Sequence, residues 1–201
     1  IRRFSSAAAL ADETASAAQR QKLADGVHRP LEMSFSMMND LLSFVSGRNP
    51  ALNRADHGLS SMIDDARSLL VTPLESAGHR LIVSVPKDLV IYCDAEKLLN
   101  ILANLIRNSA EAMSEPGEVT ITAGGDSCGV WIRVRDTGPG IEPDLLAHVF
   151  DPFVSQPGKS RPGLGLSIIK DLVERHGGTI DAENAPDGGA VFTLHFPAAA
   201  G

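Results

Sequence analysis

The hydrophobic and polar positions of this 201-residue chain follow a helical period in its first quarter. Residues 3–24 are rich in alanine and other helix formers, and Asp25-Gly26 interrupts their pattern. Pro30 suits the first turn of a second helix over residues 31–46, which is too apolar for a lone surface helix. We therefore expect a helical hairpin whose second helix packs on the first, or on a second copy of the chain.

From residue 55 onward, helical and alternating patterns follow one another. Helical spacing predicts helices over 56–76, 96–113 and 166–176, and alternation predicts strands over 81–86, 90–94, 118–123, 130–136, 179–184 and 190–196. This order predicts an α/β fold, a two-layer sandwich in which a mixed sheet carries helices on one face, preceded by the helical hairpin. Because Gly, Pro and Asn interrupt the pattern between the two parts, we divide the chain into a helical segment (1–46), a linker (47–54) and a domain (55–201).

Charge and cysteine content narrow the setting. The formal net charge of −7 disfavours nucleic acid as a partner. The two cysteines, Cys93 and Cys128, lack metal-ligand spacing and suggest a reducing cytosol. No apolar run reaches about 18 residues, so no transmembrane helix is expected. The chain begins at Ile1 without a methionine, which suggests part of a longer protein.

The first of three motifs is NLIRNSAEAM, residues 104–113. Asn104 and Asn108 are one helical turn apart and share a stripe of the predicted helix. A buried asparagine needs hydrogen-bond partners, so Asn108 either caps a neighbouring loop or offers its amide oxygen to a nucleotide-bound Mg²⁺. The residues alone leave both interpretations open.

The second motif is RDTGPGI, residues 135–141. An aspartate at a strand end, followed by Gly138 and Gly140, gives a fixed carboxylate beside backbone that a ligand can approach closely. Asp136 could accept a hydrogen bond from the exocyclic amine of adenine. The alternative is a simple turn.

The third motif is RPGLGLSIIKDLVERHGG, residues 161–178, in which Gly163 and Gly165 precede an amphipathic helix. The N-terminus of such a helix is a ready anion site, although a glycine loop before a helix is a weak signal by itself. Lys159 and Arg161 lie in the polar stretch before it, within reach of phosphates. His176 falls at the helix C-terminus, where a cation suits the helix dipole, and we interpret it as structural.

In order and spacing, these motifs resemble the catalytic ATP-binding domain of bacterial sensor histidine kinases, part of the superfamily that includes gyrase, Hsp90 and MutL. NLIRNSAEAM looks like the N box, DTGPGI like the G1 box, FDPF (150–153) like the F box and GLGLSI like the G2 box. The resemblance covers roughly residues 52–197.

The resemblance implies ATP and Mg²⁺ as cofactors. Asn108 would coordinate Mg²⁺, with Asn104 beside it. Asp136 would read the adenine amine, and two phenylalanines would anchor a short lid over about 151–162. The complete set of implied ATP-binding residues is Asn104, Asn108, Asp136, Gly138, Gly140, Ile141, Phe150, Phe153, Lys159, Arg161, Gly163, Leu164, Gly165 and Leu166.

The resemblance also implies transfer of the γ-phosphate to a histidine. Hydrolysing members such as gyrase carry a water-activating Glu at the position that Asn104 occupies here, so transfer is favoured over hydrolysis. A response-regulator receiver domain is the implied partner. The N-terminal helices would form a homodimer, and the location would be cytoplasmic, as an independent protein or as part of a membrane-linked sensor.

His28 is the candidate phosphate acceptor, with three interpretations open. Aligning Pro30-Leu31 with the family's acceptor motif puts Asp25 in the acceptor position, which makes His28 either a displaced acceptor or an ordinary residue at a helix start. A docking or bundle-packing contact is the third. The alternative to a kinase is a nucleotide-binding regulatory module that lacks its own acceptor histidine and acts on a partner protein.

Overall fold

The computed structural model describes residues 38, 51–154 and 163–198. Residues 51–154 and 163–198 belong to one compact unit of the chain. The two predicted N-terminal helices (3–24 and 31–46), apart from residue 38, lie outside the described residues. So do the first half of the predicted linker, His28, Lys159 and Arg161. The description that follows therefore concerns the predicted α/β domain.

A five-stranded sheet forms one layer of this domain, in the order β2-β4-β5-β7-β6. Its strands are β2 (Arg80–Ser84), β4 (Glu118–Asp126), β5 (Gly129–Asp136), β7 (Ala190–Pro197) and β6 (Thr179–Asn184). β2 pairs with β4 in parallel, whereas the other three pairings are antiparallel. The predicted mixed sheet is therefore confirmed.

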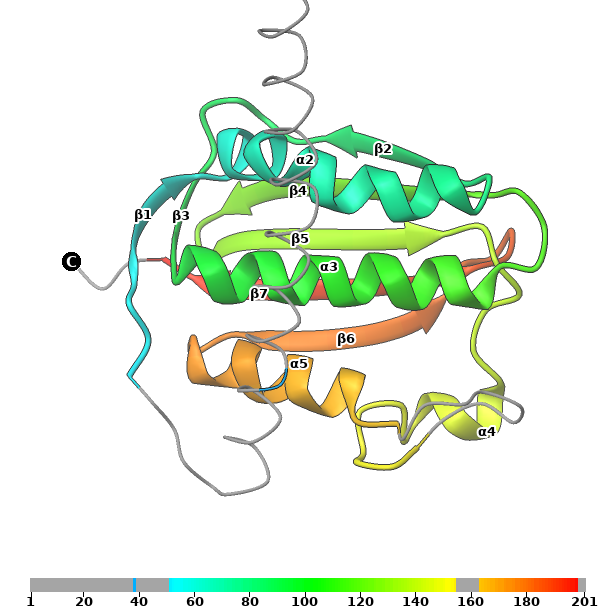
Figure 1. The fold of residues 1–201 in the computed structure, drawn as a ribbon. Helices are drawn as coiled ribbons and strands as arrows, with labels where there is room; N and C mark the ends of the chain where they lie inside the picture. Colours follow the sequence, from blue (N-terminus) through cyan, green and yellow to red (C-terminus); the bar gives the residue numbers. More distant parts are fainter. Residues whose placement is uncertain (1–37, 39–50, 155–162, 199–201) are drawn as a thin grey trace, which may run out of the picture. The chain divides into compact units, whose positions relative to one another are not determined.

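Three helices cover one face of the sheet, namely α2 (Leu59–Ser76), α3 (Ala95–Ala112) and α5 (Gly165–Arg175). In Figure 1, α3 crosses the middle of the sheet and packs between α2 and α5. The core lies between the two layers, as the sandwich prediction requires. No helix in the described part of the chain is long and apolar enough to cross a membrane.

Helix α3 forms because its sequence supplies both a cap and a continuous apolar face. The Asp94 carboxylate caps the helix by accepting a hydrogen bond from the Lys97 amide at 3.2 Å. Leucine and isoleucine then recur at helical spacing and are fully buried at positions 98, 101, 102 and 105. The polar end of the same face reaches Ser109, so this helix carries the core and the first motif together.

Two elements differ from the prediction. Residues 56–58, expected to start a helix, lie in strand β1 (Ala55–Gly58), which pairs antiparallel with β3 (Val90–Cys93) in a separate two-stranded sheet. Pairing with a strand far along the chain decides the conformation here, and periodicity within 56–76 cannot reveal it. The short helix α4 (Pro143–Leu146) was not predicted either, because a single turn leaves too little periodicity.

Candidate functional site

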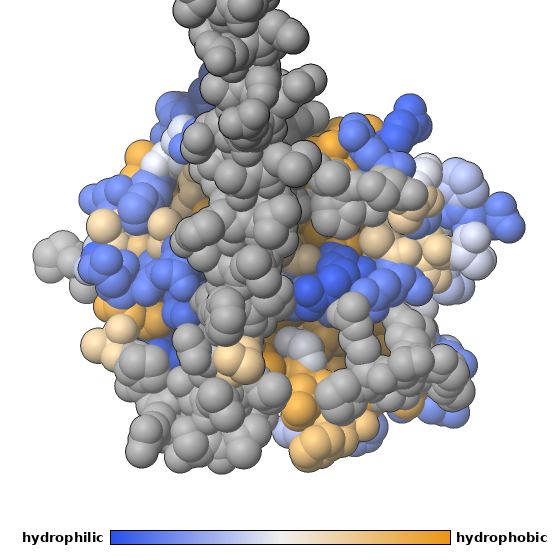
Figure 2. Space-filling view, in the orientation of Figure 1, coloured by the Kyte–Doolittle hydropathy of each residue, from blue (hydrophilic) through white to orange (hydrophobic). Residues whose placement is uncertain are grey.

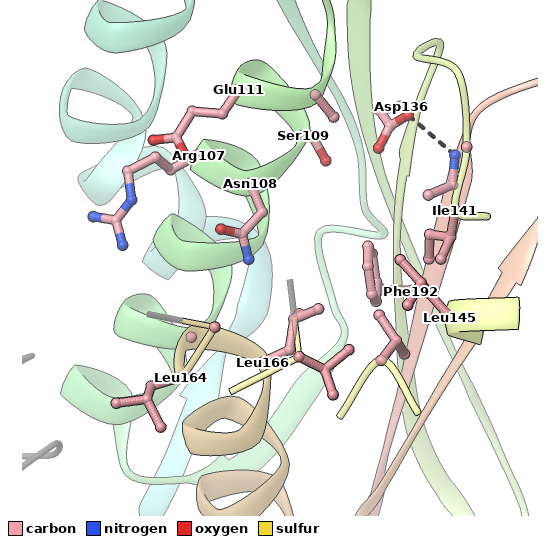
Figure 3. A pocket seen from close by; sticks show the side chains of 17 residues that line it. Arg107, Asn108, Ser109, Glu111, Asp136, Ile141, Leu145, Leu164, Leu166 and Phe192 are labelled. Atoms are coloured by element: carbon pink, nitrogen blue, oxygen red, sulfur yellow. Dashed lines mark hydrogen bonds between the residues drawn. The ribbon is translucent and has the colours of Figure 1, made fainter. Parts of the chain in front are cut away.

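A cavity of about 250 Å³ opens between the C-terminal half of α3, the end of β5, α4 and the start of α5 (Figure 3). All three sequence motifs contribute to its wall. The lining residues are Arg107, Asn108, Ser109, Glu111, Ala112, Asp136, Gly140, Ile141, Leu145, Val149, Val154, Gly163, Leu164, Gly165, Leu166, Ala190 and Phe192.

Asp136 is the carboxylate at the inner end of this cavity, and it is only 2% exposed. Its Oδ1 atom accepts a hydrogen bond from the backbone amide of Gly138, at 2.9 Å. The same atom accepts a second hydrogen bond from the backbone amide of Ala190, at 3.0 Å, drawn as a dashed line in Figure 3. Among the described residues, no hydrogen bond reaches Oδ2. One oxygen therefore fixes the side chain, and the other is left to receive a donor from the cavity.

The backbone beside Asp136 is packed too closely for side chains. Gly189 has a φ of 90°, and a Cβ there would lie 1.9 Å from the carbonyl oxygen of Asp136. Only glycine combines this backbone conformation with this approach. The hairpin between β6 and β7 thus comes into contact with the end of β5 and holds the Ala190 amide against the carboxylate.

A second clamp fixes the loop after Asp136. The Asn184 side chain accepts a hydrogen bond from the Ile141 amide and donates one to the Ile141 carbonyl, each at 2.7 Å. Gly140, with a φ of 80°, leaves room for this asparagine, because a Cβ would lie 2.7 Å from Asn184 Oδ1. Ile141 is thereby held in the cavity wall.

On α3, the two asparagines of the first motif have different surroundings. Asn108 lines the cavity, whereas Asn104 does not, and its Oδ1 accepts a hydrogen bond from the Arg107 guanidinium. Arg107 itself reaches the cavity wall. Figure 2 shows hydrophilic side chains gathered over this half of α3, next to an apolar area over α5.

The start of α5 closes the other side of the cavity. The Phe153 amide donates to the Gly163 carbonyl at 3.0 Å, which joins the two ends of the segment between them. Gly163 has a φ of 68°, and a Cβ there would lie 2.6 Å from the Val154 carbonyl oxygen. Leu164 and Gly165 then bring the first turn of α5 to the cavity, where its amides favour an anion.

The remaining wall is apolar. Phe192 lines the cavity, and Phe150 packs edge-on against it with 6.4 Å between ring centroids. Phe153, in contrast, is 74% exposed. An apolar slot that ends in one buried carboxylate suits a flat, mostly apolar ring with a hydrogen-bond donor at its edge.

The structure brings most of the predicted residues together. Asn108, Asp136, Gly140, Ile141, Gly163, Leu164, Gly165 and Leu166 all line the cavity. Four predicted residues do not line it: Asn104, Gly138, Phe150 and Phe153. Gly138 and Phe150 nevertheless contact lining residues, through the hydrogen bond to Asp136 and the ring contact with Phe192.

Sequence analysis missed several lining residues and one clamp. Arg107, Ser109 and Glu111 all lie within the first motif. Glu111 follows Asn108 by three residues, so helical spacing could have found it, whereas Arg107 and Ser109 are the immediate neighbours of Asn108 and helical spacing does not select them. Phe192 and Asn184 come from the final hairpin, and only the strand pairing brings them here. No local signal marks those two residues.

The donor set fits a metal ion that arrives with its ligand. The described residues hold no cluster of three or more His, Cys, Asp or Glu side chains able to form a metal centre. Asn108 and Glu111 offer oxygen atoms at the cavity wall. Mg²⁺ bound to phosphates needs only one or two protein oxygens, so this sparse set is sufficient.

Comparison with known proteins identifies one family and several relatives with similar sequences. The family described as "Histidine kinase-, DNA gyrase B-, and HSP90-like ATPase" matches residues 93–200. The signal transduction histidine-protein kinase AfsQ2 of Streptomyces coelicolor is 48% identical over 108 residues, covering 52% of this chain and 20% of AfsQ2. The sensor histidine kinase ZraS of Escherichia coli K12 is 29% identical over 189 residues, covering 94% of this chain and 40% of ZraS.

A solved structure agrees with the fold. The catalytic domain of the histidine kinase ThkA superposes with a TM-score of 0.66 at 28% identity, covering 73% of this chain and 96% of that domain. The chain thus spans a fifth of AfsQ2 and two fifths of ZraS, but matches nearly all of the isolated ThkA domain.

Proposed function

The chain belongs to the family of histidine kinase-, DNA gyrase B- and HSP90-like ATPases, and on that premise we propose that it is the ATP-binding catalytic region of a two-component sensor histidine kinase. Membership confirms the resemblance found in the N, G1, F and G2 boxes. The proposed reaction is transfer of the ATP γ-phosphate to a histidine side chain.

One observation carries the proposal, namely that the backbone of the domain uses only one oxygen of the Asp136 carboxylate. Its Oδ1 is fixed by two backbone amides, which leaves Oδ2 at the end of an apolar slot. Adenine presents a flat ring with an amine at one edge, so its amine can donate to Oδ2 while its faces contact Ile141 and Phe192. A guanine would place a carbonyl oxygen against the carboxylate instead, and the two acceptors would repel each other.

The phosphates would then extend toward the polar end of the cavity. The N-terminal amides of α5 lie there, and Arg107 contributes a positive charge. Lys159 and Arg161, which lie outside the described residues, are the further predicted phosphate contacts. Asn108, with Glu111 as a second oxygen donor, would hold Mg²⁺, which neutralises phosphate charge when bound.

Catalysis would consist of positioning the acceptor histidine in line with the γ-phosphate of ATP. A neutral imidazole nitrogen of the acceptor attacks the γ-phosphorus in line, the bond from that phosphorus to the bridging oxygen of the β-phosphate breaks, and ADP leaves with the electron pair. Asn104 supports transfer over hydrolysis, because an amide cannot take a proton from water and its Oδ1 is engaged by Arg107.

The rest of the proposed assembly concerns residues outside the described part of the chain. We propose that the segment 1–46 forms a homodimer through its apolar stretch at 31–46, that His28 is its candidate phosphate acceptor, and that a response-regulator receiver domain takes the phosphate onward. A cytoplasmic location would supply the ATP.

The proposal is tested with the full chain and γ-³²P-labelled ATP. We expect acid-labile, base-stable label on the wild-type protein, its loss in Asp136→Asn, and a matching loss of affinity for a non-hydrolysable ATP analogue. The change is nearly isosteric, but its amide offers a donor where adenine needs an acceptor. Unchanged analogue affinity in Asp136→Asn would show that the assigned adenine site is wrong.

The same assay distinguishes a histidine kinase with its own acceptor from a regulatory module without one. Label that disappears in His28→Gln identifies that residue as the acceptor, whereas label that survives this change places the acceptor elsewhere. Binding of the analogue without any label favours the alternative, a nucleotide-binding regulatory module that acts on a partner protein.

A further inference from the structure

Ser109 is a buried polar residue to which none of the motifs gives a role. It lies on α3, one residue after Asn108, and is 2% exposed. Its Oγ atom makes no hydrogen bond within the described part of the chain. A buried hydroxyl without a partner is unfavourable, so the position calls for an explanation.

The helix itself does not satisfy this hydroxyl. A serine inside a helix commonly donates to the carbonyl one turn earlier, which here belongs to Leu105, but Ser109 does not. Instead, Ser109 lines the cavity, and Figure 3 shows its oxygen pointing from α3 toward the side that holds Asp136. The hydroxyl is thus unpartnered, buried and aimed into the cavity.

The order of the polar groups along the cavity determines which atom of a bound nucleotide lies beside Ser109. Asn108 marks the phosphate end, and Asp136 marks the end that receives the adenine amine. In an ordinary anti nucleotide, the base edge between the phosphates and the amine carries N7, whereas N1 lies on the opposite edge. A donor on α3 between these two ends therefore faces N7.

We propose that Ser109 is a second base-reading residue, whose hydroxyl donates a hydrogen bond to adenine N7, directly or through one water. This inference rests on the proposed ATP site. Asp136 accepts from the base and Ser109 donates to it, so the pair recognises the donor and acceptor that lie side by side on the adenine amine–N7 edge. No hydrolytic or transfer step depends on Ser109.

The test pairs one substitution with two base analogues, using the full chain. Affinities of wild type and Ser109→Ala are measured for ATP, 7-deaza-ATP and 1-deaza-ATP, under conditions without turnover. Loss of one hydrogen bond corresponds to about fivefold in affinity. We expect Ser109→Ala to weaken ATP and 1-deaza-ATP by about that factor and to leave 7-deaza-ATP unchanged.

Thermal unfolding without nucleotide supplies a second readout. Because the substitution removes an unpartnered buried hydroxyl, the melting temperature should stay the same or rise. A merely structural serine would lower the melting temperature. Ser61→Ala is the matched control, since this exposed hydroxyl donates to the Gly58 carbonyl at the start of α2, outside the cavity, and the change should leave all three affinities unchanged.

Other outcomes overturn the assignment. Equal weakening of all three nucleotides would mean that Ser109 does not read N7, and weakening confined to ATP and 7-deaza-ATP would place its contact at N1. If wild type binds ATP and Asp136→Asn does not, while Ser109→Ala behaves as wild type, this inference fails and the proposed function stands.

Discussion

His176 joins the two helices that flank the cavity. It is buried at the end of α5, where its Nδ1 lies 2.7 Å from the Leu172 carbonyl oxygen. Its Nε2 accepts a hydrogen bond from the Asp94 amide, at the N-cap of α3, at 3.1 Å. A carbonyl on one side and an amide on the other require the neutral ring with its proton on Nδ1.

This bonding agrees with the interpretation of His176 as a structural residue, but the ring is neutral and does not act as a cation toward the helix dipole. Burial lowers its pKa from the ordinary value of 6.5, which outweighs the opposing effect of the hydrogen bond to Leu172. The sequence RHGG gives the position of the residue at a helix end. The sequence cannot indicate the charge state of the imidazole ring, because the amide that donates to its Nε2 belongs to Asp94, 82 residues away.

The stability of the domain should depend on pH through His176. Above the unfolded-state pKa, the ring is neutral in both states and its contribution is complete. As the pH falls through 6.5, the unfolded chain binds a proton that the folded chain does not yet accept, so the free energy of unfolding decreases until the lower folded-state pKa is passed.

Replacing His176 with Gln should remove this dependence. The variant should be less stable than wild type at pH 7.5 by about 1 kcal/mol, since the amide meets the two partners less well. Its free energy of unfolding should fall less steeply between pH 7 and pH 5, as measured by urea denaturation. His195→Gln, the same change at an exposed position, should keep the wild-type profile. Equal slopes for wild type and His176→Gln would contradict the assignment.

At the scale of elements, the final hairpin shapes the cavity as much as the motif helices do. Its strand β6 ends at Asn184, which clamps Ile141, and its turn brings Gly189 against the Asp136 carbonyl. The sequence PDGG predicts a turn correctly, since positive φ angles at both glycines are what such a turn needs. That the second glycine also permits a tertiary contact depends on strands that are far apart in the sequence.

The Asn184 clamp leads to a prediction about binding. Asn184→Ala removes both hydrogen bonds to Ile141, so the loop after Asp136 should become less ordered and the affinity for an ATP analogue should fall by about fivefold. Calorimetric titration measures the affinity. Asn184→Asp retains an acceptor for the Ile141 amide but loses the donor to its carbonyl, and we expect an intermediate affinity. Wild-type affinity in Asn184→Ala would mean that Ile141 keeps its position without the clamp.

Elements whose stabilising interactions lie within their own sequence could be predicted. Elements that depend on pairing with a strand far along the chain could not. Helix α3 carries its own cap and apolar period, so the predicted range 96–113 differs from Ala95–Ala112 by one residue at each end. Strand β1 exists only through its pairing with β3, and the helical period after it concealed it. Asp136 was found because its motif is local, whereas Phe192 reaches the same cavity through β7 and carries no motif.

At the scale of the whole molecule, the described domain has a hydrophobic core of its own. The fully buried side chains of α2 and α3, together with those of the five-stranded sheet, form one hydrophobic cluster between residues 59 and 196. The cavity is likewise lined by residues from 107 to 192. Every side chain assigned to ATP therefore lies within the predicted domain at 55–201.

This placement predicts how a shortened chain behaves. A fragment of residues 51–201 should unfold in one cooperative transition and bind an ATP analogue with the affinity of the full chain, because it retains the core and the cavity. It should sediment as a monomer, whereas the full chain, with the apolar stretch at 31–46, should sediment as a dimer. It should also acquire no label from γ-³²P-ATP, since the candidate acceptor His28 is absent. Asp136→Asn in the fragment is the control for specific binding.

Two outcomes would contradict this prediction. A fragment that fails to fold would show that residues before 51 complete the core, and the domain boundary would then move toward the N-terminus. A labelled fragment would place an acceptor inside the ATP-binding domain.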